Sequence, residues 1–290
     1  MHIEVEPDVI PTLPEHLRSG PKIAWPTLGI LALSYVVWFS SLILYLKGSI
    51  TLVPAMIIAI VAGYMVFTVA HDSVHEAVFG SEGLNYLSGL AVGLLLASPY
   101  SGFRVLHLAH HDRCNSVGHD ADVWSGGGGR TWTLPFRWLT QDLYYYYFIL
   151  TKMLHLLSIP EMILIVTELV GLVAVGLGMS LLGFGHEVLF LWVIAGRIAV
   201  MFLAFALNYL PHRPMGSDPN NPYNSTINIG GSVAAFFFLC QNYHLIHHLY
   251  PHLPFYWYSV VLKEVEEQLE ARGAVHIGVF ESLPEEENTG

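Results

Sequence analysis

Charged residues are scarce in this chain of 290 residues, and their scarcity limits what the protein can be. Only 12% of the residues are charged, only 12 residues are lysine or arginine, and the formal net charge is −11. A nucleic-acid-binding surface needs clustered basic residues, which this sequence lacks. Hydrophobic residues make up 53% of the chain, and the mean hydropathy is +0.51. The composition therefore indicates a multi-spanning membrane protein rather than a soluble domain.

Cysteine is also rare, because Cys114 and Cys240 are the only two in the chain. Two cysteines so far apart form no zinc-finger spacing, iron–sulfur motif or disulfide framework. A glycine-rich dinucleotide-binding fingerprint is absent from the sequence as well. Any redox reaction would therefore need electrons from a separate protein. Cys114 follows a histidine cluster and could line a site there, although an unbonded spectator thiol is the simpler interpretation.

Histidine, in contrast, is abundant, with 16 residues, and half of them fall into three dense clusters. The clusters are His71-Asp-Ser-Val-His75, His107-Leu-Ala-His110-His111 and His244-Leu-Ile-His247-His248. Composition alone predicts roughly 0.05 copies of a His-x-x-His-His pattern, and the chain has two. Residues three and four apart share one face of a helix, so each cluster presents its imidazoles to one point. Eight such groups are too many for one ion, and they predict a site for two metal ions.

Four apolar runs, the first two of them without a charge, are each long enough to cross a bilayer as a helix. They are residues 24–46, 50–70, 160–183 and 187–210. Short turns join them in pairs, which predicts two hairpins. The run 84–100 has only 17 residues, and we expect it to be re-entrant, because a full crossing would put His71 and His107 on opposite sides. Residues 131–152 mix aromatic and charged side chains, which predicts an interfacial helix.

The predicted fold is all-α: a multi-pass membrane protein with four transmembrane helices, interfacial or re-entrant helices and a cytoplasmic, histidine-rich cap. We divide the chain into an N-terminal arm (1–23), a membrane domain (24–261) and an acidic C-terminal tail (262–290). Both termini and all histidine clusters then lie on one side. Ten of the 12 basic residues lie on that side, whereas Lys47 lies on the other side and Arg197 within a span. By the positive-inside rule the clusters face the cytoplasm, and we expect a bacterial inner membrane.

Two charged residues within the predicted spans need partners, since an unpaired charge in a bilayer is costly. Glu168 and Arg197 lie in neighbouring antiparallel spans. Counted from the shared turn, they differ in depth by about five residues, or roughly 7 Å. We therefore expect an ion pair between them, with a structural role.

The three clusters, together with Asn208-x-x-x-His212, resemble the integral-membrane fatty acid desaturase and hydroxylase superfamily over nearly the whole chain. The resemblance implies that nine histidines hold two iron ions and that Asn208 is a weak or water-mediated ligand. The implied metal-binding residues are His71, His75, His107, His110, His111, Asn208, His212, His244, His247 and His248.

Within the superfamily, the third box is the most specific part of the resemblance. Gln241-Asn-Tyr-His-Leu-Ile-His-His-Leu-Tyr-Pro251 is similar to cyanobacterial-type β-carotene 3-hydroxylases and bacterial carotenoid ketolases. The first box is less similar, since Ala77-Val-Phe79 follows His75-Glu76 where a histidine or asparagine is expected. This departure affects the choice of substrate rather than the metal chemistry.

Neutral histidine ligands next to a membrane favour iron, dioxygen and attack on a C–H bond of a lipophilic substrate, because zinc does not change its redox state. The leading prediction is an O2-dependent di-iron oxygenase that hydroxylates the ring of β-carotene, with a ferredoxin as the external electron donor. A carotenoid ring ketolase and a fatty acyl desaturase remain as enzyme alternatives. A membrane metal transporter would place its ligands near the bilayer midplane rather than at span ends. A haem protein would leave the repeated clusters unexplained.

Acidic residues next to the histidine boxes could orient imidazole N–H groups toward the metals. The candidates are Asp72, Glu76, Asp112, Asp120 and Asp122. For each of them the alternative is a solvated acid in a loop. His119 and His252 are expected to be spectators rather than ligands.

Overall fold

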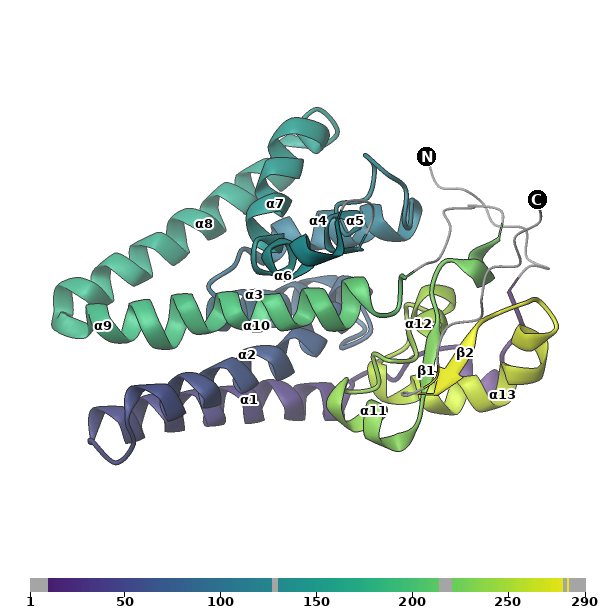
Figure 1. Ribbon diagram of the computed structural model, residues 1–290, viewed down its shortest axis with the longest axis horizontal. Helices are drawn as coiled ribbons and strands as arrows, with labels where there is room; N and C mark the ends of the chain where they lie inside the picture. Colours follow the sequence, from purple (N-terminus) through teal and green to yellow (C-terminus); the bar gives the residue numbers. More distant parts are fainter. Residues whose placement is uncertain (1–9, 127–129, 214–220, 279–280, 282–290) are drawn as a thin grey trace.

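The computed structural model describes residues 10–126, 130–213, 221–278 and 281. Helices dominate, and the sheet in these residues consists of two short parallel strands. Two helical hairpins have their turns at one end of the molecule, while α12 (His244–Leu249) and α13 (Tyr258–Glu270) lie at the opposite end (Figure 1). The prediction of an all-α, multi-pass membrane protein is confirmed.

The first hairpin consists of α1 (Trp25–Leu46) and α2 (Leu52–Val74). Gly48 makes the turn with a φ of +69°, a conformation that glycine adopts without strain. Both helices are long and apolar enough to cross a membrane, and most of the α1 surface is exposed. Exposed apolar helices of this length fit a lipid environment. Ser41 of α1 donates a hydrogen bond to the Ala55 carbonyl oxygen and joins the two helices.

The second hairpin is one long helical segment, residues 159–209, that reverses at Gly183, where φ is +96°. Its first arm is α8 (Ile159–Met179), which begins with a capping box between Ser158 and Glu161. The remaining pieces are η4 (Ser180–Phe184), α9 (Gly185–Glu187), η5 (Val188–Ile194), α10 (Ala195–Leu203) and η6 (Ala204–Tyr209).

The two hairpins meet where α2 contacts α10. At Gly63 of α2 an added Cβ would lie only 3.0 Å from the Cβ of Ala199. Small residues at this contact therefore let the two backbones approach closely, as is common between membrane helices. The close contact holds the end of α2, with its histidines, next to the end of the second hairpin.

The short apolar run forms a bent pair, α3 (Glu82–Leu96) and α4 (Tyr100–Asp112), with an angle of 112° between the two helices. Ala97 makes the bend with a left-handed φ of 51°. The pair follows the histidine end of α2 in the chain, and its own histidines return to that end. The imidazole centroids of His71 and His107 are 4.8 Å apart. Such a path fits the predicted re-entrant segment.

The predicted ion pair between Glu168 and Arg197 is wrong. Glu168 accepts hydrogen bonds from the Tyr86 hydroxyl and from the backbone N–H of Ser101 at 2.9 Å. Arg197 pairs with Asp142 and donates to the carbonyl oxygen of Leu96 at 2.6 Å. Backbone groups at the break between α3 and α4 have no partner within a helix. The N–H of Ser101 binds Glu168 and the carbonyl oxygen of Leu96 binds Arg197, so the two charges have different partners.

Short elements form the cap around the histidines. Between the hairpins they are α5 (Val123–Gly126), η2 (Thr131–Thr133), α6 (Leu134–Leu139), α7 (Gln141–Phe148) and η3 (Ile149–Met153). The remaining elements are η1 (Glu15–Leu17), η7 (Pro222–Asn224), β1 (Asn228–Gly230), α11 (Ser232–Phe237), η8 (Phe255–Trp257) and β2 (His276–Gly278). Strand β1 pairs with β2 in parallel. The aromatic segment expected at 131–152 therefore consists of several short helical pieces.

The expected boundary between residues 261 and 262 falls inside one helix, α13. Val261, Val265 and Leu269 on its inner face are all buried and belong to the same core as Leu245 of α12. Apolar burial on one face of a helix is the usual way to attach it to a core. The first part of the predicted tail thus packs against the histidine-bearing part of the chain. Residues 1–9 of the predicted arm lie outside the described residues.

Candidate metal centre

Four segments bring the histidines together. His71 lies in the last turn of α2, and His75 follows that helix directly. Helix α4 carries His107, His110 and His111, and α12 carries the third cluster. His212 lies three residues beyond the end of η6. The segments converge at the end of the molecule opposite the hairpin turns (Figure 1).

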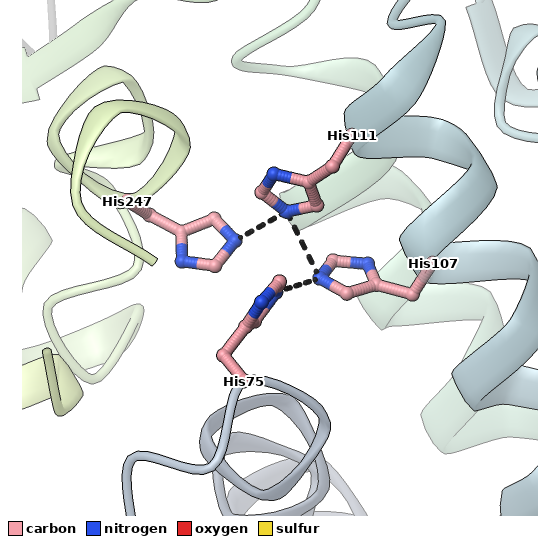
Figure 2. A group of neighbouring side chains, drawn as sticks. All are labelled: His75, His107, His111 and His247. Carbon is pink, nitrogen blue, oxygen red and sulfur yellow. Dashed lines mark hydrogen bonds between the residues drawn. The ribbon is translucent and has the colours of Figure 1, made fainter. Parts of the chain in front are cut away.

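A first set of side chains, the four-histidine group, consists of His75, His107, His111 and His247. Their ring nitrogens face one another, and consecutive Nε2 atoms are 2.9, 3.2 and 2.8 Å apart (Figure 2). With a metal–nitrogen distance of about 2.1 Å, two neighbouring ligand nitrogens on one ion lie about 3.0 to 3.4 Å apart, and the three observed distances are within about 0.2 Å of that range. The group therefore has the spacing of a metal site.

A second set, the mixed group, consists of His110, Cys114, His212 and His248. The Nε2 atoms of His110 and His248 are 3.3 Å apart. The two groups are neighbours, because the rings of His111 and His248 stack with centroids 4.3 Å apart. The residues thus form two adjacent groups, each of which could hold a metal ion.

Two further predicted ligands lie at the edges of these groups. The ring of His71 is 4.0 Å from that of His247 between centroids, and the ring of His244 is 4.8 Å from that of His212. Both nitrogens of His71 and Nδ1 of His244 are buried and have no hydrogen-bond partner among the described residues. Buried polar atoms are normally satisfied, so bound metal ions would account for these two histidines. The donor set therefore fits a pair of metal ions.

Asn208 lies outside both groups. Its side-chain amide donates hydrogen bonds to Oδ1 of Asp122 and to the hydroxyl of Tyr145, each at 3.0 Å. The structure therefore places Asn208 next to an acid that in turn approaches His110. Its predicted role as a weak or water-mediated ligand stays a prediction.

The five acidic candidates occupy three kinds of position. Asp120 accepts a hydrogen bond from Nδ1 of His110 at 2.9 Å, and Asp122 lies 3.5 Å from the same atom. Asp72 instead accepts from the Thr27 hydroxyl at 2.8 Å. Because Asp72 also accepts from the backbone N–H of residue 255, it joins α1, α2 and the segment before α13. The remaining two acids, Glu76 and Asp112, are exposed.

The site has two neighbours that sequence reasoning did not single out. Oδ1 of Asn115 lies 3.1 Å from Nδ1 of His212, and the Tyr258 hydroxyl lies 3.0 Å from Nδ1 of His247. Such contacts hold an imidazole in one orientation and leave its other nitrogen for a metal. Asn115 follows the second cluster closely enough to have been a candidate. Tyr258 belongs to the next helix, and no spacing in the sequence connects it with His247.

Burial favours the neutral form of most of these imidazoles, whereas the Asp120 carboxylate raises the pKa of His110. Burial and the nearby His110 lower the pKa of His75 and that of His244 to about 3. Burial and neighbouring histidines also hold the pKa of His247 and that of His248 well below the usual value. A neutral imidazole is the form that binds a metal ion. At neutral pH these histidines therefore need not lose a proton before they bind metal.

An apolar cavity lies next to the histidines, between α2, α3, α4, α7 and the second hairpin. We call it the aromatic cavity; its lining includes Phe67, Phe103, Tyr145, Tyr146, Leu203 and Asn208. The ring of Phe103 stacks on that of His107, with centroids 5.2 Å apart, and the ring of Phe67 is 6.2 Å from that of His71. An apolar molecule in this cavity would therefore contact two phenylalanine rings that in turn lie against His107 and His71.

The sequence of this chain is similar to one family of known proteins. A family model described as fatty acid desaturase matches residues 48–280. The chain is also similar to a protein named sn-1 linoleoyl-lipid 6-desaturase from Synechocystis sp., with 24% identity over 148 residues. That match covers 44% of this chain and 41% of the relative, so the chain spans less than half the length of the curated relative it matches.

Proposed function

This chain belongs to the fatty acid desaturase family. From that premise we propose that it is a membrane oxidoreductase of the di-iron type and that it hydroxylates the ring of a carotenoid such as β-carotene. The reaction would consume dioxygen, two electrons and two protons for each C–H bond, and it would release one water molecule. The chain has no electron-transfer motif of its own, so a separate donor such as a ferredoxin would supply the electrons.

The observation that carries the proposal is the aromatic cavity. Phe67 and Phe103 contact each other with ring centroids 5.0 Å apart, and both extend to metal-binding histidines. Aromatic side chains favour offset or edge contacts with other flat π-systems. The flat, conjugated polyene chain of a carotenoid therefore suits this lining. The third histidine box, with its similarity to carotenoid hydroxylases, supports the same substrate class.

We assign the two metals as iron, held by the nine histidines that the resemblance implies, with Asn208 as a weak or water-mediated ligand. Bound iron would supply the ability to activate dioxygen for attack on a C–H bond. The chain itself supplies neutral imidazoles and Asp120, which holds His110 with Nε2 toward the mixed group. The mostly apolar lining of the cavity would reduce the water around a bound substrate, which would favour attack on the bound C–H bond over side reactions.

We also propose that the site and both termini face the cytoplasm of a bacterial inner membrane. The distribution of lysine and arginine supports this orientation, since Lys47 is at the turn of the first hairpin and ten of the 12 basic residues are on the histidine side. A cytoplasmic site would be accessible to a soluble electron donor. The bilayer itself would deliver the lipophilic substrate to the cavity between the helices.

A second candidate function is desaturation of a fatty acyl chain. It is supported by the relative named as a linoleoyl-lipid desaturase. Ring ketolation uses the same substrate class as hydroxylation and differs in the extent of oxidation. Hydroxylation and desaturation would share the metal site and differ in which C–H bonds the cavity holds near it.

The experiment that tests these candidates is pigment and lipid analysis of a β-carotene-producing bacterium that expresses the full chain. We expect zeaxanthin or its mono-hydroxylated precursor, and we expect both to disappear in a His247→Ala variant. The matched control is His16→Ala, because His16 is an exposed histidine in η1. Immunoblots of membranes would show that all variants accumulate equally.

The other outcomes separate the alternatives. Canthaxanthin would identify a ketolase. Unchanged carotenoids with new double bonds in membrane lipids would identify an acyl desaturase. If neither pool changes although metal-loaded protein and a competent donor are present, the carotenoid assignment is wrong.

A further inference from the structure

The mixed group contains one side chain that is not a histidine. Cys114 lies two residues beyond the end of α4, and its sulfur joins His110, His212 and His248. The Sγ atom is 3.5 Å from Nδ1 of His212 and 4.0 Å from Nε2 of His110. All four side chains of the four-histidine group are imidazoles, whereas the mixed group has three imidazoles and one thiol.

These distances are compatible with binding to a common ion. With a metal–sulfur distance of about 2.3 Å and a metal–nitrogen distance of about 2.1 Å, two ligands of one ion are at most about 4.4 Å apart. The 4.0 Å between the sulfur and Nε2 of His110, the nitrogen that His110 directs into the mixed group, is below that limit. Among the described residues, the carbonyl oxygen of Ser225 is the other acceptor near the sulfur, and at 3.9 Å it is a weak hydrogen-bond partner for the thiol.

The neighbours of His212 point in the same direction. Oδ1 of Asn115 lies 3.1 Å from Nδ1 of His212 and is a better partner for that N–H than the sulfur at 3.5 Å. His244 adds a buried ring next to His212, with an Nδ1 atom that has no partner among the described residues. The sulfur therefore lies among the imidazoles of the mixed group.

We propose that Cys114 is a thiolate ligand of the metal ion in the mixed group. The inference rests on the proposed two-metal function and assigns the coordination of one of its ions. On metal binding the thiol proton leaves to solvent and a metal–sulfur bond forms, with no change in oxidation state. The thiolate gives this ion a negatively charged ligand, while the other ion has imidazoles only.

The chain offers a matched control, because Cys114 and Cys240 are its only cysteines. Cys240 has no place in either group. The full-length protein, purified in detergent and freed of metal, would be loaded with Co²⁺, and with Fe²⁺ under anaerobic conditions. Thiolate coordination gives a near-ultraviolet charge-transfer band with Co²⁺ and a sulfur shell at about 2.3 Å in the iron X-ray absorption spectrum.

We expect the band and the sulfur shell in wild type and in Cys240→Ser, and their loss in Cys114→Ser. A signal in Cys240→Ser is sufficient by itself, since Cys114 is then the only cysteine, even if Cys114→Ser fails to fold. Two bound ions without any sulfur signal in wild type would overturn the proposal and leave the two-metal site intact. A signal that disappears in Cys240→Ser would overturn it as well. A chain that binds no metal at all would refute the proposed function together with this inference.

Discussion

The two halves of the metal centre share their helices but differ in what surrounds them. Helix α4 contributes His107 and His111 to the four-histidine group and His110 to the mixed group. Helix α12 divides its neighbouring pair His247 and His248 in the same way. Successive residues on a helix are about 100° apart, so one short helix can face two ions. The repeated His-x-x-His-His spacing therefore serves both groups at once.

The supports of the two groups differ in charge. In the four-histidine group His247 contacts the neutral hydroxyl of Tyr258. In the mixed group His110 contacts the carboxylate of Asp120, with Asp122 close by. A carboxylate on the outer nitrogen makes an imidazole a stronger donor than a neutral partner does. We therefore expect the mixed group to bind its ion more tightly, although the two groups are built on the same helices.

The largest effect is expected from removing one ligand in each group. His247→Ala and His248→Ala should each lower the metal content from two ions per chain to one, because a histidine ligand is lost from a different group in each case. Both variants should lose activity, since the reaction needs the pair. Metal analysis of the purified variants tests this. If either variant keeps two tightly bound ions, the division into two groups is incorrect.

We expect Glu168→Leu to weaken metal binding in both groups by the same amount. Glu168 accepts hydrogen bonds at the start of α4, and α4 carries ligands of both groups. Each donor that loses its partner costs about 1 to 3 kcal/mol. Thermal unfolding should shift downward, and both ions should be bound less tightly. Glu168→Gln, which keeps an acceptor oxygen, should be closer to wild type. A selective loss of one ion would contradict this explanation.

Asp120→Asn should distinguish the two groups. The substitution removes the carboxylate from Nδ1 of His110, and changes of this kind lower metal affinity about 10- to 100-fold. Only the ion of the mixed group should be affected. Competition with a chelator would show one weakened and one unchanged binding step. Asp112→Asn, at an exposed acid on α4, is the control and should leave both steps unchanged.

The smallest effect is expected from Tyr258→Phe. The substitution removes one neutral hydrogen bond to His247, which contributes about 1 kcal/mol, or about fivefold in affinity. In the same chelator competition, the weakened metal-binding step should be that of the four-histidine group. A loss as large as that of Asp120→Asn would show that the charge of the supporting group does not matter.

Much of the architecture could be predicted from the sequence. The apolar runs are as long as a bilayer is thick, and this property can be read along the chain without knowledge of its folding. The histidine spacings indicate two metals because imidazoles three and four residues apart share a helix face. Helices α1, α2 and α8 and the reversal at Gly183 agree with that prediction to within a few residues.

Only the tertiary structure decided which side chains meet. The 112° bend between α3 and α4 brings Ser101 to Glu168 and the Leu96 carbonyl oxygen to Arg197, so these two charges do not pair. The packing of four segments at one end of the hairpins separates the histidines into two groups and places Cys114 in one of them. A sequence determines how far along a helix a residue lies. The rotation of each helix about its axis and the angle at each break depend on the packing of all the helices together.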